Sequence, residues 1–149
     1  MSLEKQVMEK MKEAMKAKDT VALASLRSIK SEILKAKTAT ADAGEMSSEE
    51  EIKLLQRLVK QRKDSAEVYA QQGREDLAAP ELSEAAIIEQ FLPAQLSDEE
   101  IEASVKQIIA STGASSMKDM GKVMGLASQE LAGKADGKRI SAAVKASLA

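Results

Sequence analysis

Apolar side chains recur every three or four residues along most of this 149-residue chain. That spacing places them on one side of an α-helix. The run from residue 20 to residue 36 shows it well, with an apolar stripe of Ala22, Leu26, Ile29, Ile33 and Ala36. Only two prolines and few β-branched runs interrupt the pattern, which also favours helix over strand. The sequence therefore predicts an all-α fold.

Local capping signals set the expected helix boundaries. Ser47 with Glu50 and Ser97 with Glu100 both match the capping box, in which each side chain satisfies a backbone donor of the first turn. Aspartates are placed as N-caps and glycines as helix ends elsewhere. We expect helices near residues 3–16, 20–36, 48–72, 81–91, 98–112, 117–131 and 137–148, and a loop over residues 38–46.

The expected core is aliphatic and filled by methionine. Tyr69 and Phe91 are the chain's only aromatic residues, whereas it contains eight methionines. In the sixth predicted helix the apolar stripe alternates spacings of three and four residues, through Met117, Met120, Met124, Ala127 and Leu131. We expect this stripe to face the core.

A domain boundary is expected near Pro93. Proline ends one predicted helix there, and the capping box at Ser97 begins the next. We therefore predict an N-terminal domain of about four helices over residues 1–93 and a C-terminal domain of three helices over residues 94–149.

The residues that are missing exclude most enzyme mechanisms. The chain has no cysteine and no histidine, so thiol nucleophiles, histidine bases and the usual zinc ligands are all absent. We expect no catalytic residue, no metal and no cofactor. No apolar run approaches the roughly 20 residues that span a bilayer, and the N-terminus lacks a signal pattern. We expect a cytoplasmic protein with no membrane contact.

Glycine and lysine gather near the C-terminus. Five of the seven glycines lie between residues 113 and 137, and residues 113–149 carry a net charge of +3 against −5 for the rest. On a helical wheel with Met117 at zero, the expected core stripe lies at roughly 280–340°, whereas Gly121 and Gly125 lie near 40° and 80°, beside Lys118 and Lys122. This arrangement predicts a side-chain-free strip edged by two cations, which phosphate oxygens can approach. The alternative is that the glycines permit close helix packing and the lysines are merely solvated.

The turn before the last helix adds further cations. Lys134, Lys138 and Arg139 surround Asp136, the expected N-cap, and cations in a first turn oppose the helix dipole. A bound anion would relieve that conflict. The alternative is that the segment only ends one helix and begins the next, and that its charges have no ligand. A second basic run, Lys60–Asp64, is either a solvated surface or an extension of the predicted phosphate contact.

Five segments make the chain resemble the GatB/YqeY family, and in particular its stand-alone YqeY-like proteins. They are Lys60–Ser65, Gly73–Leu77, Phe91–Ser97, Gly113–Gly125 and Lys134–Lys138. The resemblance extends over nearly the whole chain. The resemblance implies an N-terminal helical domain and a three-helix C-terminal domain similar to the tail of the B subunit of tRNA-dependent amidotransferases.

In those enzymes the tail helps to engage tRNA, while the chemistry takes place in a larger domain that this chain lacks. The resemblance therefore implies a non-catalytic module that binds tRNA or another structured RNA. The matching positions are Lys118, Gly121, Lys122, Gly125, Lys134, Lys138 and Arg139. Two alternatives are an accessory component of a carbon-nitrogen ligase that uses glutamine as its amido donor, and a module that binds a protein partner.

Overall fold

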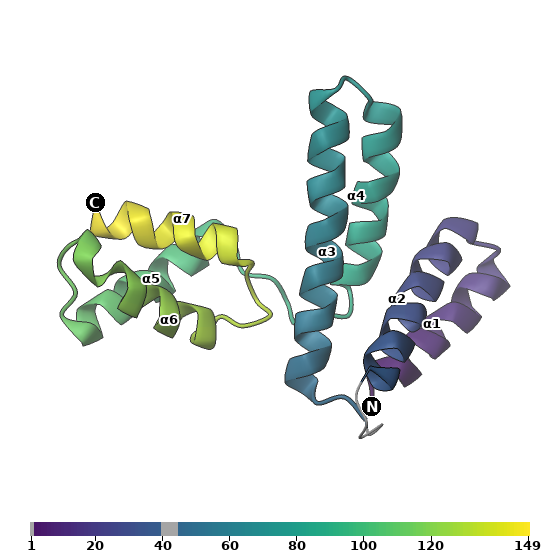
Figure 1. Ribbon diagram of the computed structural model, residues 1–149, viewed down its shortest axis with the longest axis horizontal. Coiled ribbons are helices and arrows are strands. Elements are labelled where there is room, and N and C mark those ends of the chain that lie inside the picture. The colour runs from purple at the N-terminus through teal and green to yellow at the C-terminus, as the bar shows by residue number, and fades with distance from the viewer. Residues whose placement is uncertain (1, 40–44) are drawn as a thin grey trace. The chain divides into compact units, whose positions relative to one another are not determined.

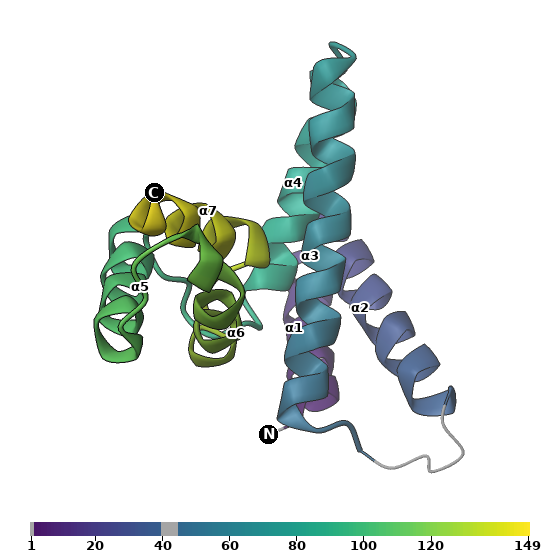
Figure 2. The ribbon, with the colours of Figure 1, turned by 60° about the vertical axis from the view of Figure 1, so that its left-hand side comes forward.

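The computed structural model describes residues 2–39 and 45–149, and every regular element in these residues is helical (Figures 1 and 2). This confirms the predicted all-α class. The α-helices are α1 (Leu3–Ala17), α2 (Thr20–Thr38), α3 (Ser48–Gln71), α4 (Glu75–Glu89), α5 (Asp98–Thr112), α6 (Met120–Glu130) and α7 (Gly137–Leu148). A short 3₁₀ turn, η1 (Met117–Asp119), precedes α6. The predicted loop over residues 38–46 falls largely on residues 40–44, which lie outside the described residues.

Both predicted capping boxes are present. The Ser47 hydroxyl accepts a hydrogen bond from the Glu50 backbone N–H at 3.2 Å, and the Glu50 carboxylate accepts one from the Ser47 N–H at 3.0 Å. Ser97 and Glu100 repeat this pair of bonds at the start of α5. Each box satisfies donors that have no partner inside the helix, so α3 and α5 begin where the sequence predicts.

Helix ends require left-handed backbone at three described positions. Gly73 and Gly113 end α3 and α5 with φ of 73° and 71°, as their glycine character predicts. Lys18 ends α1 with φ of 57°, and it is the one non-glycine residue with positive φ in the described part of the chain. Asp19 then caps α2 by accepting a hydrogen bond from the Ala22 N–H at 3.1 Å.

The predicted start of the fourth helix is wrong. Sequence analysis began it at Glu81, one residue after Pro80. In the structure α4 begins at Glu75 and includes Pro80. Two features favour the longer helix: the acidic residues of its first turn suit the positive end of the helix dipole, and Ala78 is almost fully buried.

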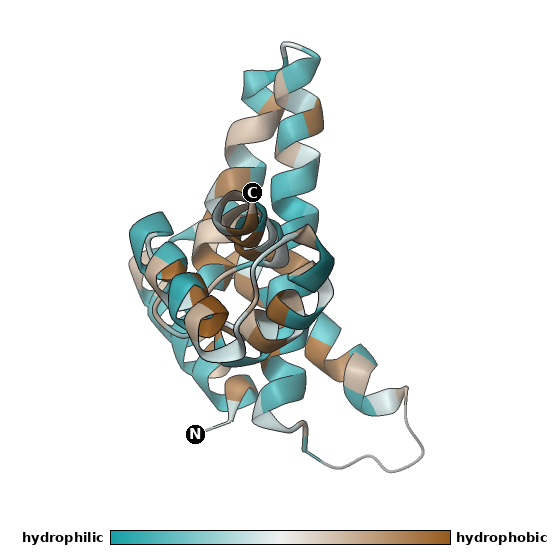
Figure 3. Cartoon of the chain, turned by 90° about the vertical axis from the view of Figure 1, so that its left-hand side faces the viewer, coloured by the Kyte–Doolittle hydropathy of each residue, from teal (hydrophilic) through white to brown (hydrophobic). Residues whose placement is uncertain are grey.

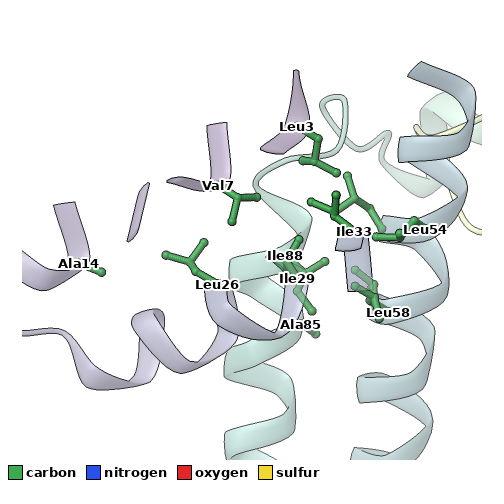
Figure 4. Close-up of a cluster of buried hydrophobic side chains, with 12 residues drawn as sticks. Leu3, Val7, Ala14, Leu26, Ile29, Ile33, Leu54, Leu58, Ala85 and Ile88 are labelled. Atoms are coloured by element: carbon green, nitrogen blue, oxygen red, sulfur yellow. The ribbon is translucent and has the colours of Figure 1, made fainter. Parts of the chain in front are cut away.

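Contacts divide the chain into two compact units, Met1–Leu92 and Pro93–Ala149. In the first unit α1 packs on α2, α3 packs on α4, and α2 contacts both α3 and α4. Their leucine, isoleucine and valine side chains converge in one core, which Figure 4 shows. In the second unit α5, α6 and α7 enclose a separate aliphatic core. Hydrophobic and hydrophilic residues both colour the helices in Figure 3.

Methionine does not fill either core, contrary to the prediction. Among the described residues, the fully buried large side chains are leucine, isoleucine and valine. Met11, Met46, Met120 and Met124 lie at the edges of the cores, and three other methionines are exposed. Leucine and β-branched side chains have fewer rotatable bonds than methionine and lose less freedom when buried, which suits them to the interior.

Replacing Lys18 by glycine is expected to stabilise the protein by about 0.5–1 kcal/mol, because glycine adopts the left-handed backbone without a steric penalty. Thermal or denaturant unfolding measures the change. Lys12→Gly is the matched control in the interior of α1, where glycine should destabilise by about 1 kcal/mol. Equal destabilisation by both substitutions would contradict this account of the α1 end.

Candidate nucleic-acid interface

The N-terminal end of α6 is held by side chains of the preceding turn. The Ser116 hydroxyl accepts a hydrogen bond from the Lys118 N–H at 3.4 Å, and Asp119 Oδ2 accepts one from the Ser115 N–H at 3.0 Å. This turn is a 3₁₀ turn rather than α-helix, so the wheel drawn from Met117 is shifted for the rest of the helix.

The 3₁₀ turn leaves the first residue of the predicted stripe exposed, while the rest of the stripe lies on the expected side of α6. Val123 and Ala127 are fully buried, whereas Met117, expected to begin the buried stripe, is 47% exposed. Val123 was missed because the regular methionine spacing suggested a stripe one position away. Met120 and Met124 pack at the edge of the core, and Leu131 is buried as expected.

Gly121 and Gly125 lie on the exposed side of α6. A Cβ atom added at either position would meet no neighbouring heavy atom within 4 Å. Close helix packing requires such neighbours, so the packing explanation for these glycines is wrong. The backbone of α6 is open to an approaching ligand at both positions.

Two exposed lysines accompany this open backbone. Lys118 lies in η1 and Lys122 in the first half of α6. Within the part of the chain that the structure describes, neither ammonium group forms an ion pair. We call Lys118, Gly121, Lys122 and Gly125 the glycine strip.

The turn between α6 and α7 is anchored to the segment before α5. Gly133 has φ of 78° and is buried. Its carbonyl accepts a hydrogen bond from Gln95 Nε2 at 2.7 Å, and the Lys134 carbonyl accepts one from the Leu96 N–H at 2.9 Å. The Lys134 backbone is therefore fixed, while its side chain is exposed to solvent.

The start of α7 separates Lys138 from Arg139. Asp136 is the N-cap, as predicted, and accepts a hydrogen bond from the Arg139 N–H at 2.8 Å. The Lys138 side chain is exposed and forms no ion pair within the described residues. Its ammonium group remains available to a ligand.

Arg139 has a structural role that sequence analysis missed. Its guanidinium donates to the Leu96 carbonyl at 2.8 Å and to Asp98 Oδ1 at 3.1 and 2.8 Å. Asp98 therefore balances a cation that the sequence left uncompensated in the first turn of α7. The partner lies 41 residues away, so no local pattern indicates the pair. The structure brings Arg139 to the start of α5 and not to the glycine strip.

A neighbouring carboxylate also has a structural function. The pKa of the Glu100 carboxyl lies below its ordinary value, because the Ser97 backbone N–H and then the Ser97 side chain form hydrogen bonds with it. The ionised form is thus stabilised by the capping box. Glu100 closes the start of α5.

The basic run on α3 is engaged by acidic partners. Arg62 is half-buried and contacts Glu84 at 3.3 Å and Ser28 at 2.8 Å, while Lys63 contacts Glu89 at 2.7 Å. These bonds hold α3 against α2 and α4. Charges neutralised in this way contribute less attraction to phosphate than the unpaired lysines of the glycine strip.

Comparison with known proteins gives two findings. A family model described as "Yqey-like protein" matches residues 4–148. A protein of Clavispora lusitaniae named "Altered inheritance of mitochondria protein 41, mitochondrial" is 38% identical over 101 residues, which cover 66% of this chain and 58% of that relative. The match thus spans little more than half of the relative's length. No helix in the described residues has both the length and the hydropathy of a membrane span.

Replacing Arg139 by alanine is expected to destabilise the protein by about 1–2 kcal/mol, because the Leu96 carbonyl and the Asp98 carboxylate lose a charged donor. Denaturant unfolding checks this. Lys138→Ala, one residue earlier and exposed, should change stability by less than about 0.5 kcal/mol. A similar loss in both variants would contradict the structural role of Arg139.

Gly121→Ala and Gly125→Ala should each raise stability by about 0.5–1 kcal/mol, since alanine favours helix over glycine and the added methyl group meets no neighbour. Thermal unfolding of each variant measures the effect. Destabilisation by either methyl group would show that another part of the protein closes over the glycine strip.

Proposed function

The chain belongs to the Yqey-like protein family, and on this premise we propose that it is a non-catalytic RNA-binding module that contacts phosphates through its C-terminal unit. The observation that carries the proposal is the glycine strip: within the described residues its two ammonium groups form no ion pair, and a Cβ atom added at either glycine would meet no heavy atom within 4 Å. Such a surface suits phosphate and sugar groups, which bind cations and polar backbone without regard to base sequence.

Lys134 and Lys138 extend the proposed contact beyond the C-terminal end of α6. Both side chains are exposed, and the α6–α7 turn that carries them is fixed by its bonds to Gln95 and Leu96. A rigid turn presents its cations without an ordering cost, which favours binding. Arg139 supports this turn and is a positioning residue in the proposal, instead of the direct contact that sequence analysis assigned to it.

The resemblance of the C-terminal segments to the tail of tRNA-dependent amidotransferases makes tRNA the first RNA to test. A catalytic role is not proposed, because the chain contains neither histidine nor cysteine. Placement in the cytoplasm stays a prediction.

The proposal is tested by measuring tRNA affinity over a series of salt concentrations. If lysine side chains neutralise a few phosphates, the logarithm of tRNA affinity falls linearly with the logarithm of salt concentration. Each phosphate contact contributes about 0.7–0.9 to the magnitude of that slope. Lys118→Ala/Lys122→Ala should weaken binding about tenfold and reduce the slope by about 1.4–1.8.

The matched control is Lys12→Ala/Lys16→Ala. These two lysines are also four residues apart, are exposed on α1, and form no ion pair within the described residues. Their removal changes the net charge equally. If this control loses as much tRNA affinity as the Lys118→Ala/Lys122→Ala variant, the loss reflects net charge alone. That result would overturn the assignment of the glycine strip.

A further inference from the structure

A second candidate surface lies in the N-terminal unit, on one side of the α3–α4 helix pair. A groove of about 550 Å³ is lined by Gln61, Arg62, Asp64 and Ser65 of α3 and by Glu81 and Glu84 of α4. The two helices run side by side in both ribbon views (Figures 1 and 2). Neither the RNA proposal nor the core uses this groove.

The groove is negatively charged. Three carboxylates line it against one guanidinium, and that guanidinium is already bonded to Ser28 and Glu84. Asp64 contacts the exposed Lys60 at 2.6 Å. Glu81 forms no ion pair within the described residues, and its side chain is only half-buried. Across the described residues no three carboxylates lie close enough together to hold a metal ion.

Two exposed apolar side chains lie beyond the lining of the groove, toward the turn that joins the two helices. Val68 lies one helical turn beyond Asp64, and Leu77 lies one turn before Glu81, so each shares a helix side with a lining carboxylate. They are 51% and 37% exposed. Between the two helices only small side chains are buried at this level, namely Ala66 and Ala78.

The combination of charge and apolar surface selects the kind of ligand. Phosphate groups would be repelled by the excess of carboxylates, and a small cation would leave Val68 and Leu77 uncovered. We propose that this groove docks a short segment of a partner protein, with a lysine or arginine side chain at Glu81 and an apolar side chain over Val68 and Leu77. Charge complementarity and burial of the exposed apolar pair both favour this occupant.

A synthetic helical peptide of lysine and leucine tests the proposal on the full chain. The control is a second peptide that has glutamate in place of each lysine and keeps the same leucines. Backbone amide shifts in NMR should change at Gln61, Ser65 and Val68 with the lysine peptide, and the glutamate peptide should bind at least about tenfold more weakly.

Each interaction has a matched pair of variants. Glu81→Gln should weaken binding of the lysine peptide about threefold to fivefold, whereas Glu75→Gln, exposed on another side of α4, should not. Val68→Ser should weaken binding of the lysine peptide by a similar factor. Leu82→Ser should not, because Leu82 is equally exposed, at 52%, but lies on another side of α4.

Three results would overturn the proposal: no binding of the lysine peptide, equal effects of the paired variants, or amide shifts confined to other surfaces. Spermidine that binds as tightly as the peptide and is insensitive to Val68→Ser would assign the groove to small cations instead. Because the groove and the glycine strip lie in different units, tRNA binding can fail or succeed without changing any of these outcomes.

Discussion

The structure depends on aliphatic helix stripes that meet in two separate cores. No cysteine is available to form a crosslink, and each fully buried leucine, isoleucine or valine contributes about 1.5–3 kcal/mol. In α6 this burial also orients the helix. Because Val123 and Ala127 face the core of the C-terminal unit, Gly121 and Gly125 are left on the outer side, where their backbone is open.

Signals that act over a few residues could be read from the sequence. The capping boxes, the aspartate N-caps and the glycines at helix ends are local hydrogen-bonding and backbone requirements, and the structure contains them where they were expected. The start of α4 could not be read in this way, because packing against α3 outweighs the local preference of Pro80. Methionine was assigned to the core from composition and helical spacing, whereas the depth of burial depends on which helices pack against each position.

The candidate interface shows the same limit. The positions of Gly121 and Gly125 on one side of a helix follow from spacing, yet only the structure shows that nothing covers them. Arg139 has the same sequence context as Lys138, but its partner Asp98 is distant in the chain and near in space. Cations that bind a ligand and cations that hold the fold together can therefore be separated only after long-range contacts are known.

The central claim is that bare helix backbone at the glycine strip receives the phosphate groups of RNA. It is tested most directly by the tRNA affinity of Gly121→Gln/Gly125→Gln, in which both lysines and the net charge are kept while two side chains fill the strip. We predict at least about tenfold weaker binding in a variant that unfolds no earlier than the parent, because glutamine favours helix over glycine. Unchanged affinity in the folded variant would contradict the claim.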